Sequence, residues 1–349
     1  MRFAARSQAV KMTLKVGIMG AGMMGIAHAQ AYHAAGVELV GVTDVDNKRA
    51  IDLANRFGGR AYPSLEELVA ADLDAVSVCL PHDLHLRAAS LAAERGVHVL
   101  MEKPLANTLD EACQIIDLCQ EAKIKLMLGF IQRFLTQVQH LHAQVREGVF
   151  GRVGLAVEYL AAGGAWPIVP TWYKQRAKAG GGIMMIGNIH TVDRLRWLLG
   201  SEADTVYGSI QQINSEGDVE DIGSAIIRYA SGAQATIIGV RSPLSTHRRR
   251  WTLELYGERA ESSFMLEHTN AQTLELTTAS GVQTFTVPAE DPFRAEINEF
   301  VEAIKQDRDP RPSGHDGLVS LATVLAIYES ARTGLPVNVP DYMQSMRRI

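Results

Sequence analysis

The first 130 residues alternate short apolar runs with longer stretches of helical periodicity. The apolar runs are rich in Val, Ile, Leu and Met and end at glycine, proline or a charged residue, which is typical of buried strands. Strands are predicted at 14–20, 37–44, 74–81, 97–102 and 124–130. One intervening helix begins at Thr108 with acidic residues in its first turn, an ordinary capping signal. Because parallel strands need helical crossovers, the alternation predicts a doubly wound α/β domain at residues 13–130.

A different pattern follows residue 130. Helical periodicity continues to about residue 147 and returns near 190–199, and a glycine-rich segment with tryptophans lies between. Short alternating runs then recur without long crossovers, which is typical of an antiparallel sheet. These runs lie at 205–214, 222–230, 233–240, 250–257, 261–268, 273–279 and 282–289. Two helices, at 292–306 and 317–333, close a second α+β domain at residues 131–349 with a large open, mainly antiparallel sheet.

Composition narrows the class of protein. A chain of 349 residues fits about two domains of ~150 residues, and 47% hydrophobic with 21% charged residues is typical of a soluble globular protein. The net charge of -5 gives no reason to expect a nucleic-acid or membrane partner. Cys79, Cys113 and Cys119 form neither a metal motif nor a disulfide framework, which favours cytoplasmic residence and no bound metal. No apolar run reaches the ~18 residues of a membrane span.

A glycine motif opens the first domain. Gly20, Gly22 and Gly25 follow the G-x-G-x-x-G spacing directly between a predicted strand and a predicted helix. Such glycines permit a tight turn and let the backbone approach a pyrophosphate, while the helix N-terminus offers free N–H groups. Met23 and Met24 lie within this turn and are included in the predicted cofactor site.

An acidic residue at the end of the second strand supports the motif. Asp44 follows Gly25 at the distance where a carboxylate accepts both ribose hydroxyls of an adenosine. The pair of features predicts dinucleotide binding. Because a 2′-phosphate would be repelled by Asp44, NAD is favoured over NADP, although Lys48 and Arg49 lie close enough to soften that preference.

The carboxyl ends of the later strands should face the nicotinamide, since ligands of such sheets bind at that edge. The segment "HVLMEKPLAN" delivers Glu102, Lys103 and Pro104 to this edge. Lys103 falls where a substrate hydroxyl would lie, and desolvation together with neighbouring charge can bring its pKa into a working range. The alternative is a solvent-exposed Glu102–Lys103 pair at a strand end, which would contribute little energy.

Several segments together resemble one known family. The glycine motif, "CLPHDLHLRAA", "EKPLANTLDEA", "GFIQRF", "GGGIMMIGNIHTVDRLRWLLG" and "YESARTGLPVNV" look like the glucose-fructose oxidoreductase, inositol dehydrogenase and MocA (Gfo/Idh/MocA) family. The resemblance extends from Lys15 to Val339. It implies a Rossmann domain, a second domain whose open sheet forms a dimer or tetramer, and NAD(P)-dependent oxidation or reduction of a ring carbon in a sugar or cyclitol.

The resemblance also implies roles for individual residues. Lys103 is implied to be catalytic or to bind the substrate hydroxyl, with Glu102 and Pro104 shaping the nicotinamide pocket and a cis Lys103–Pro104 peptide. Relatives of the inositol dehydrogenase type carry Asp-x-x-x-His, in which the histidine is the general acid/base. The chain keeps His190 but has Ile186 in place of the aspartate. The groups considered for orienting His190 are therefore Asn188 and Asp193, and a structural His190 is the alternative.

The remaining candidates surround these residues by position. Leu80, Pro81, His82 and His85 should flank the cofactor, with His85 expected to serve structure more than binding. Arg133 is a candidate for contact with nicotinamide or substrate, and its alternative is an interdomain salt bridge. Candidates for the substrate pocket are the aromatic residues Trp166, Trp172 and Tyr173, the cations Lys174 and Arg176, and Asn188.

Three functions are compatible with these residues. The first is a reversible NAD-dependent dehydrogenase of a sugar, sugar derivative or cyclitol, with Lys103 and His190 handling the proton. The second, to which Ile186 draws attention, is an enzyme that keeps NAD bound and uses transient oxidation for elimination, glycoside cleavage or epimerisation. The third is a non-catalytic nucleotide sensor, which the retention of both Lys103 and His190 disfavours.

Overall fold

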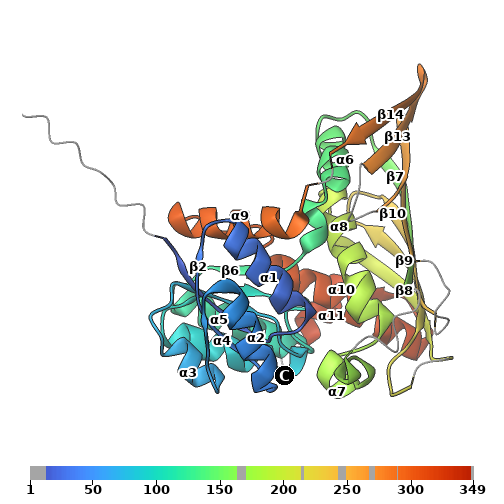
Figure 1. The fold of residues 1–349 in the computed structure, drawn as a ribbon. Helices are drawn as coiled ribbons and strands as arrows, with labels where there is room; N and C mark the ends of the chain where they lie inside the picture. Colours follow the sequence, from blue (N-terminus) through green and yellow to red (C-terminus); the bar gives the residue numbers. More distant parts are fainter. Residues whose placement is uncertain are drawn as a thin grey trace, which may run out of the picture.

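Two sheets organise the chain in the computed structural model (Figure 1). The structure describes residues 13–162, 170–213, 216–242, 249–266, 272–288 and 290–346. The predicted α/β class is confirmed: a six-stranded sheet is built from the first 128 residues, and a nine-stranded sheet from the strands that follow.

The first sheet is wholly parallel, with the strand order β3-β2-β1-β4-β5-β6 of a Rossmann fold. Its strands are β1 (Lys15–Met19), β2 (Glu38–Thr43), β3 (Arg60–Ala61), β4 (Ala75–Val78), β5 (His98–Met101) and β6 (Leu126–Leu128). Five of them coincide with predicted runs. The sequence pattern did not predict β3, because two residues are too few to show a period.

Helical crossovers connect these strands. They are α1 (Met23–Ala34), α2 (Asn47–Phe57), α3 (Leu65–Val69), the 3₁₀ turn η1 (His82–Leu84) with α4 (His85–Glu94), and α5 (Leu109–Glu121). Their ends carry the expected caps. The Thr108 side chain accepts from the Glu111 backbone N–H at 3.2 Å, and Gly58 ends α2 in the left-handed conformation.

The second sheet has the order β14-β13-β12-β11-β7-β10-β9-β8-β15. Its strands are β7 (Val153–Ala162), β8 (Ala203–Gln211), β9 (Ile222–Tyr229), β10 (Gln234–Arg241), β11 (Arg250–Gly257), β12 (Ala260–Met265), β13 (Gln272–Thr278), β14 (Gly281–Val287) and β15 (Val337–Asn338). One pair departs from the antiparallel pattern predicted for the alternating runs, because β7 and β10 are parallel. Parallel neighbours need a crossover, and the chain between them supplies helices that cover one face of the sheet.

The helices of the second half are η2 (Ile131–Phe134), α6 (Thr136–Arg146), η3 (Thr171–Lys174), α7 (Arg176–Ala179), the π-helical turn η4 (Met184–Asn188), α8 (Ile189–Leu199), α9 (Pro292–Lys305), α10 (Gly314–Thr333) and α11 (Val339–Met346). Of these, α6, α8, α10 and α11 pack against strands of the large sheet (Figure 1). Helix α9 returns to the first sheet and packs beside α1, where Ile297 and Phe300 join the core behind β1.

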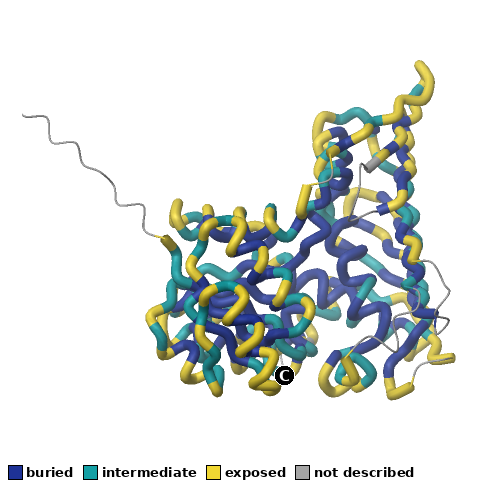
Figure 2. The backbone as a smooth tube through the Cα atoms, in the orientation of Figure 1, coloured by how far each residue is buried: buried dark blue, intermediate teal, exposed yellow. Residues whose placement is uncertain are grey.

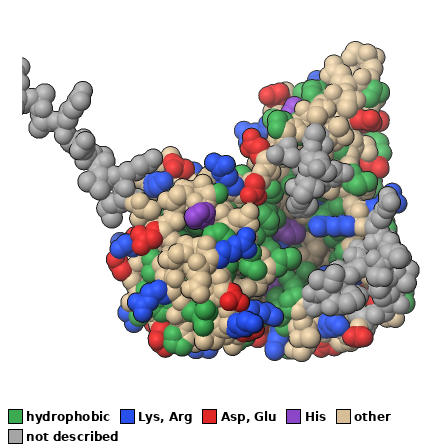
Figure 3. Space-filling model, in the orientation of Figure 1, with side chains coloured by type: hydrophobic (Ala, Val, Ile, Leu, Met, Phe, Trp, Pro, Cys, Tyr) green, Lys and Arg blue, Asp and Glu red, His purple; other side chains and the backbone are tan. Residues whose placement is uncertain are grey.

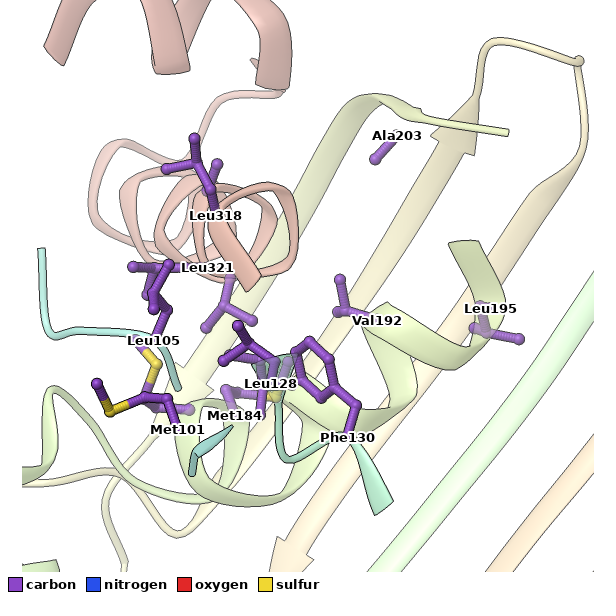
Figure 4. Packing of buried hydrophobic residues seen from close by; sticks show 14 of the residues in the cluster. Met101, Leu105, Leu128, Phe130, Met184, Val192, Leu195, Ala203, Leu318 and Leu321 are labelled. Carbon is purple, nitrogen blue, oxygen red and sulfur yellow. The ribbon is translucent and has the colours of Figure 1, made fainter. Parts of the chain in front are cut away.

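One hydrophobic core connects the two sheets. Met101 and Leu128, at the carboxyl ends of β5 and β6, belong to the same buried cluster as Met184 of η4 and Leu321 of α10 (Figure 4). The buried backbone is continuous across this junction (Figure 2). Because packed cores resist deformation, the carboxyl edge of the first sheet and the turn η4 are held in a fixed relation.

Candidate active site

The glycine turn between β1 and α1 has the geometry of a phosphate-binding loop. Gly20 has φ +98°, and a Cβ there would lie 2.4 Å from the Cys79 carbonyl oxygen; a Cβ at Gly25 would lie 1.9 Å from the Gly20 oxygen. Gly22 differs, because nothing lies within 4 Å of the position its Cβ would take. It begins α1 without a side-chain cap. The turn is therefore tightly packed on the inside and open at the helix N-terminus, as a pyrophosphate requires.

Asp44 lies beside this turn at the end of β2. Its Oδ2 accepts from the Ala21 backbone N–H at 2.7 Å, and its Oδ1 accepts from the Asp46 N–H at 2.8 Å. Each carboxylate oxygen has a second lone pair, so Asp44 can fix the turn and still accept ribose hydroxyls. Arg49 pairs with Asp46 at 3.3 Å. These residues fit an NAD(P) dinucleotide.

Lys103 contacts the second half of the chain directly. Its Nζ donates to the Ile186 carbonyl oxygen at 3.0 Å, and the Lys103–Pro104 peptide is cis. Burial lowers the pKa of the lysine below its ordinary value of 10.5; the charge of Glu102 opposes this shift, and that of Arg241 adds to it. The amine is therefore placed where it can exchange a proton more readily than a solvated lysine.

The turn η4 brings His190 into the same region. A π-helical turn from Met184 to Asn188 runs directly into α8, whose second residue is His190. The imidazole is buried, with 8% of the residue exposed, and packs edge-on against Phe130 and Trp251. Asn188 is fully buried and its Nδ2 donates to the Ile238 carbonyl at 3.4 Å. Asn188 therefore fastens η4 to strand β10.

A buried glutamate holds the start of this helical segment. Glu220 accepts from the Gly182 and Met184 backbone N–H groups at 2.9 and 3.1 Å and from the Tyr328 hydroxyl at 2.7 Å. These bonds satisfy donors that a helix N-terminus leaves unpaired. Glu220 therefore positions the segment that carries the acceptor of Lys103 and leads to His190.

Aromatic residues line one side of the site. The rings of Trp172 and Tyr173 stack at 4.1 Å, and the edge of His82 meets Trp172 at 4.9 Å. His82 Nδ1 lies 2.9 Å from the Ala179 carbonyl, so this nitrogen carries the proton. Burial holds the pKa of His82 well below its ordinary value, and the imidazole is neutral. His82 thereby joins the carboxyl edge of the first sheet to α7.

Other predicted cofactor residues have structural partners. His85 Nδ1 lies 3.0 Å from the Pro104 carbonyl, and its Nε2 lies 3.2 Å from the Leu80 carbonyl. These contacts are consistent with a structural role for His85, and its contact with the cofactor stays a prediction. His85 ties the Leu80–Pro81 turn to the cis peptide beside Lys103.

Glu102 faces a buried polar cluster behind Lys103. His28 Nε2 lies 3.3 Å from Glu102 and 3.8 Å from Glu296 of α9. On its other side, His28 Nδ1 lies 3.0 Å from the Ser77 hydroxyl. Burial, then the charge of Glu102, raise the pKa of Glu296 well above its ordinary value. The cluster separates Glu102 from solvent and makes it a fixed neighbour of Lys103, unlike the exposed pair considered from sequence.

Arg133 has two acidic partners of its own. Its Nε donates to Asp193 at 2.8 Å, its Nη2 donates to both Asp193 and Asp316, and the guanidinium lies over Trp197. These contacts correspond to the salt bridge considered for Arg133. They also give Asp193, one of the groups considered for orienting His190, a different partner.

Lys174 and Arg176, the two cations predicted for the substrate pocket, also have acidic partners. Lys174 Nζ bonds Glu216 at 2.7 Å, and the Arg176 guanidinium lies 3.6 Å from Glu220. Trp166 lies outside the described residues.

The surface is hollowed between the half of the molecule that holds the first sheet and the half that holds the second. Histidine and Lys or Arg side chains are visible on the wall of this hollow (Figure 3).

Sequence reasoning missed three contributors: Glu220, Glu296 and Arg241. Arg241 had a signal in the sequence, because an apolar run ends in a charge there as it does at Lys103. Glu296 and Glu220 had none, since their contacts join segments at least 36 residues apart in the chain.

The described part of the chain was searched for metal-binding groups and for membrane-spanning helices. No group of three or more His, Cys, Asp or Glu side chains there could hold a metal ion. None of the helices there combines the length and apolar character needed to cross a bilayer.

The sequence matches two family models. Residues 14–130 match "Oxidoreductase family, NAD-binding Rossmann fold" (GFO_IDH_MocA), and residues 142–339 match "Oxidoreductase family, C-terminal alpha/beta domain". The two matches account for most of the chain.

Individual proteins are similar along almost the whole length. The D-xylose 1-dehydrogenase (NADP(+)) 2 of Haloferax volcanii is 32% identical over 93% of this chain and 99% of its own. The inositol 2-dehydrogenase of Rhizobium meliloti is 29% identical over 91% of this chain and 97% of its own. The solved levoglucosan dehydrogenase, in complex with NADH, superposes with a TM-score of 0.85 at 26% identity, over 94% of this chain and 100% of that one.

Proposed function

The chain belongs to the Gfo/Idh/MocA family of NAD(P)-dependent oxidoreductases, and from this premise we propose that it is a dehydrogenase of a sugar, sugar derivative or cyclitol that uses Lys103 and His190 to handle the proton. The observation that supports the proposal is the contact of Lys103 with Ile186 of η4, the turn that leads into α8 and His190. The named activities of the relatives support the substrate class.

Lys103 is proposed as the group that takes the hydroxyl proton. When bound, the nicotinamide would accept a hydride from the carbinol carbon, and the neutral Nζ of Lys103 would accept the hydroxyl proton. In reduction, the protonated amine returns it. The lowered pKa of Lys103 supports this role, because a larger neutral fraction is present near neutrality. His190 is the alternative acceptor of this one proton.

We propose NAD as the preferred cofactor. Asp44 presents its carboxylate at the end of β2, where a 2′-phosphate would meet a negative charge. The nearby Arg49 is paired with Asp46. The similar proteins use either cofactor: the Haloferax relative is named for NADP(+), and levoglucosan dehydrogenase was solved with NADH.

We also infer assembly through the outer face of the large sheet. Tyr207 of β8 and Ile226 of β9 are register partners and are 48% and 50% exposed, and Tyr256 and Met265 continue the exposed apolar face across β11 and β12. An exposed apolar face on an open sheet is typical of a protein–protein interface. We propose that the same face of a second copy of the chain packs against it. Cytoplasmic residence remains an expectation, supported by the three free thiols.

The test is a substrate panel. Purified protein is incubated with NAD or NADP and with aldoses, sugar acids, anhydrosugars and inositols, and reduced cofactor is followed by its near-ultraviolet absorbance. Formation of NADH with at least one sugar or cyclitol is expected. Cleavage of a glycoside by protein that retains its cofactor, without net NADH, would replace the dehydrogenase by the transient-oxidation function that Ile186 raises.

A further inference from the structure

A histidine between two buried carboxyl groups lies behind the proposed catalytic lysine. His28 of α1 is fully buried, and its Nε2 lies 3.3 Å from Glu102 Oε1 and 3.8 Å from Glu296 Oε2. Glu102 follows β5 and Glu296 belongs to α9, and both are buried. Because an uncompensated buried charge is costly, such a cluster requires a defined arrangement of its protons.

The surroundings of the His28 imidazole fix its tautomer. A lone pair on Nε2 would face the Glu102 carboxylate, so Nε2 carries the proton. On the other side, Nδ1 lies 3.0 Å from the Ser77 hydroxyl, which lies 3.0 Å from the Tyr32 hydroxyl. Tyr32 can donate to Ser77, and Ser77 can donate to Nδ1. A neutral His28 therefore has a partner for Nδ1 and turns an N–H toward Glu102.

Glu296 holds the second proton of the cluster. Its two carboxyl oxygens are buried and have no hydrogen-bond donor among the described residues. Burial, then the charge of Glu102, raise the pKa of Glu296 well above its ordinary value. Glu102 differs, because its Oε2 accepts from the Lys103 backbone N–H at 3.3 Å. The cluster therefore holds one negative charge, and that charge is on Glu102.

The groups that surround this charge come from several elements. Burial raises the pKa of Cys79, with the charges of Glu102 and Glu296 adding to the shift, and burial also raises the pKa of Tyr32. Both stay protonated near neutrality. Burial lowers the pKa of His85, so this imidazole is neutral. Further charged or titratable groups close to Glu102 or Lys103 are His82, Tyr173 and Arg241.

We propose that His28 is a positioning residue for proton transfer at Lys103, because its Nε2–H keeps Glu102 ionised beside the lysine while Glu296 stays protonated and adds no second charge. This inference rests on the proposed function and adds a residue to it. A donor facing a carboxylate favours its ionised form, whereas a second carboxylate at the same place would oppose it. The Glu102 charge in turn opposes the lowering of the Lys103 pKa by burial.

The pH dependence of kcat/KM tests the role of His28. The neutral amine of Lys103 is the base, so kcat/KM for oxidation rises with pH. His28→Leu removes the donor, so Glu102 takes up a proton more readily and the rising limb should move to lower pH by roughly one unit. His28→Gln retains an N–H donor and should stay closer to the wild type. His33→Leu, an exposed change on α1, is the control.

Thermal unfolding establishes that each variant is folded, and His28→Ala replaces His28→Leu if the leucine variant is not. A merely structural role would lower the unfolding temperature and leave the limb in place. A limb that stays in place, or that moves to higher pH, in the folded variant without the donor would overturn the proposal.

Variants of the carboxyl groups test the pathway of the effect. Glu102→Gln already lacks the charge, so adding His28→Leu should give no further shift of the limb. Glu296→Gln replaces a neutral acid by a neutral amide of the same shape and should leave the limb in place, as should the exposed control Glu302→Gln. A further shift in the double variant, or a shift in Glu296→Gln, would overturn the proposal.

Chemical labelling of Lys103 keeps the test independent of turnover. Acetic anhydride reacts with a neutral amine, so the rate of acetylation of the partly exposed Lys103 against pH follows its proton. Mass spectrometry should give a lower midpoint for His28→Leu than for the wild type, and equal midpoints would overturn the proposal. If no panel compound reduces the cofactor, the proposed function fails, and the labelling still decides the role of His28.

Discussion

The Nζ of Lys103 lies 3.0 Å from the carbonyl oxygen of Ile186, so the candidate catalytic amine of the first domain is held by the backbone of the second. The contact falls on a π-helical turn, a local irregularity that is frequent at functional sites. An apolar side chain at this position does not weaken the contact, because the acceptor is main-chain. The arrangement makes the proton chemistry dependent on the packing between the two sheets.

The pH dependence of sugar oxidation should follow Lys103. The neutral amine is the base, so kcat/KM should rise with pH through a pKa below the ordinary 10.5 of lysine. Because Glu102 raises that pKa, Glu102→Gln should move the rising limb to lower pH. Glu121→Gln, an exposed change of equal charge on α5, should leave the limb in place. A limb that stays put or moves to higher pH in Glu102→Gln would contradict the role of Lys103.

Cofactor choice should depend on Asp44. Asp44→Ser removes the charge that repels a 2′-phosphate, so the ratio of kcat/KM for NADP to that for NAD should rise on the order of tenfold, or about 1.4 kcal/mol. Asp52→Ser removes the same charge from an exposed site on α2 and should leave the ratio near its wild-type value. An unchanged ratio in Asp44→Ser would place the ribose elsewhere.

Arg133 should contribute to stability more than to binding. Arg133→Met leaves the buried Asp193 without its bidentate partner, which should lower the free energy of unfolding by about 3–5 kcal/mol. Arg152→Met breaks an exposed pair with Glu258 and should cost less than about 1 kcal/mol. Urea unfolding measures both. A folded Arg133→Met protein of normal stability with a raised KM would favour the binding role.

The outer face of the large sheet should control assembly. Ile226→Glu places a charge among the exposed apolar residues of β8 and β9, which should weaken association at least about tenfold. Ile51→Glu, on the exposed side of α2, serves as the control. Light scattering after size-exclusion chromatography gives the mass. A wild-type chain that is monomeric would remove the basis for this prediction.

Local features of the sequence were enough to predict most of the fold. The G-x-G-x-x-G turn, the charge at the end of β5 and the alternating runs of the second half all depend on neighbouring residues. The parallel pairing of β7 with β10 was not predictable, because more than 70 residues separate Val157 from its register partner Thr236. Periodicity shows which residues face the core and does not show which strand lies alongside.

The contacts of the remaining site residues join segments that are distant in the sequence, so the sequence pattern could not predict them. Arg133 pairs with Asp193 and Asp316, 60 and 183 residues away in the sequence, and its contact with nicotinamide or substrate stays a prediction. Glu296 reaches the back of the site only because α9 returns to pack on α1. The sequence pattern located the charged strand ends, and tertiary packing determines which of those charges face a ligand.

The most direct test of the account compares turnover by the wild type and Lys103→Met with the best substrate of the panel. Lys103→Met should lower kcat/KM by about 10²- to 10⁴-fold, the usual contribution of a proton-transferring side chain, while the Kd for NAD(H) stays within about threefold. Lys305→Met, an exposed change on α9, should match the wild type. Full activity in Lys103→Met with normal cofactor binding would contradict the central claim.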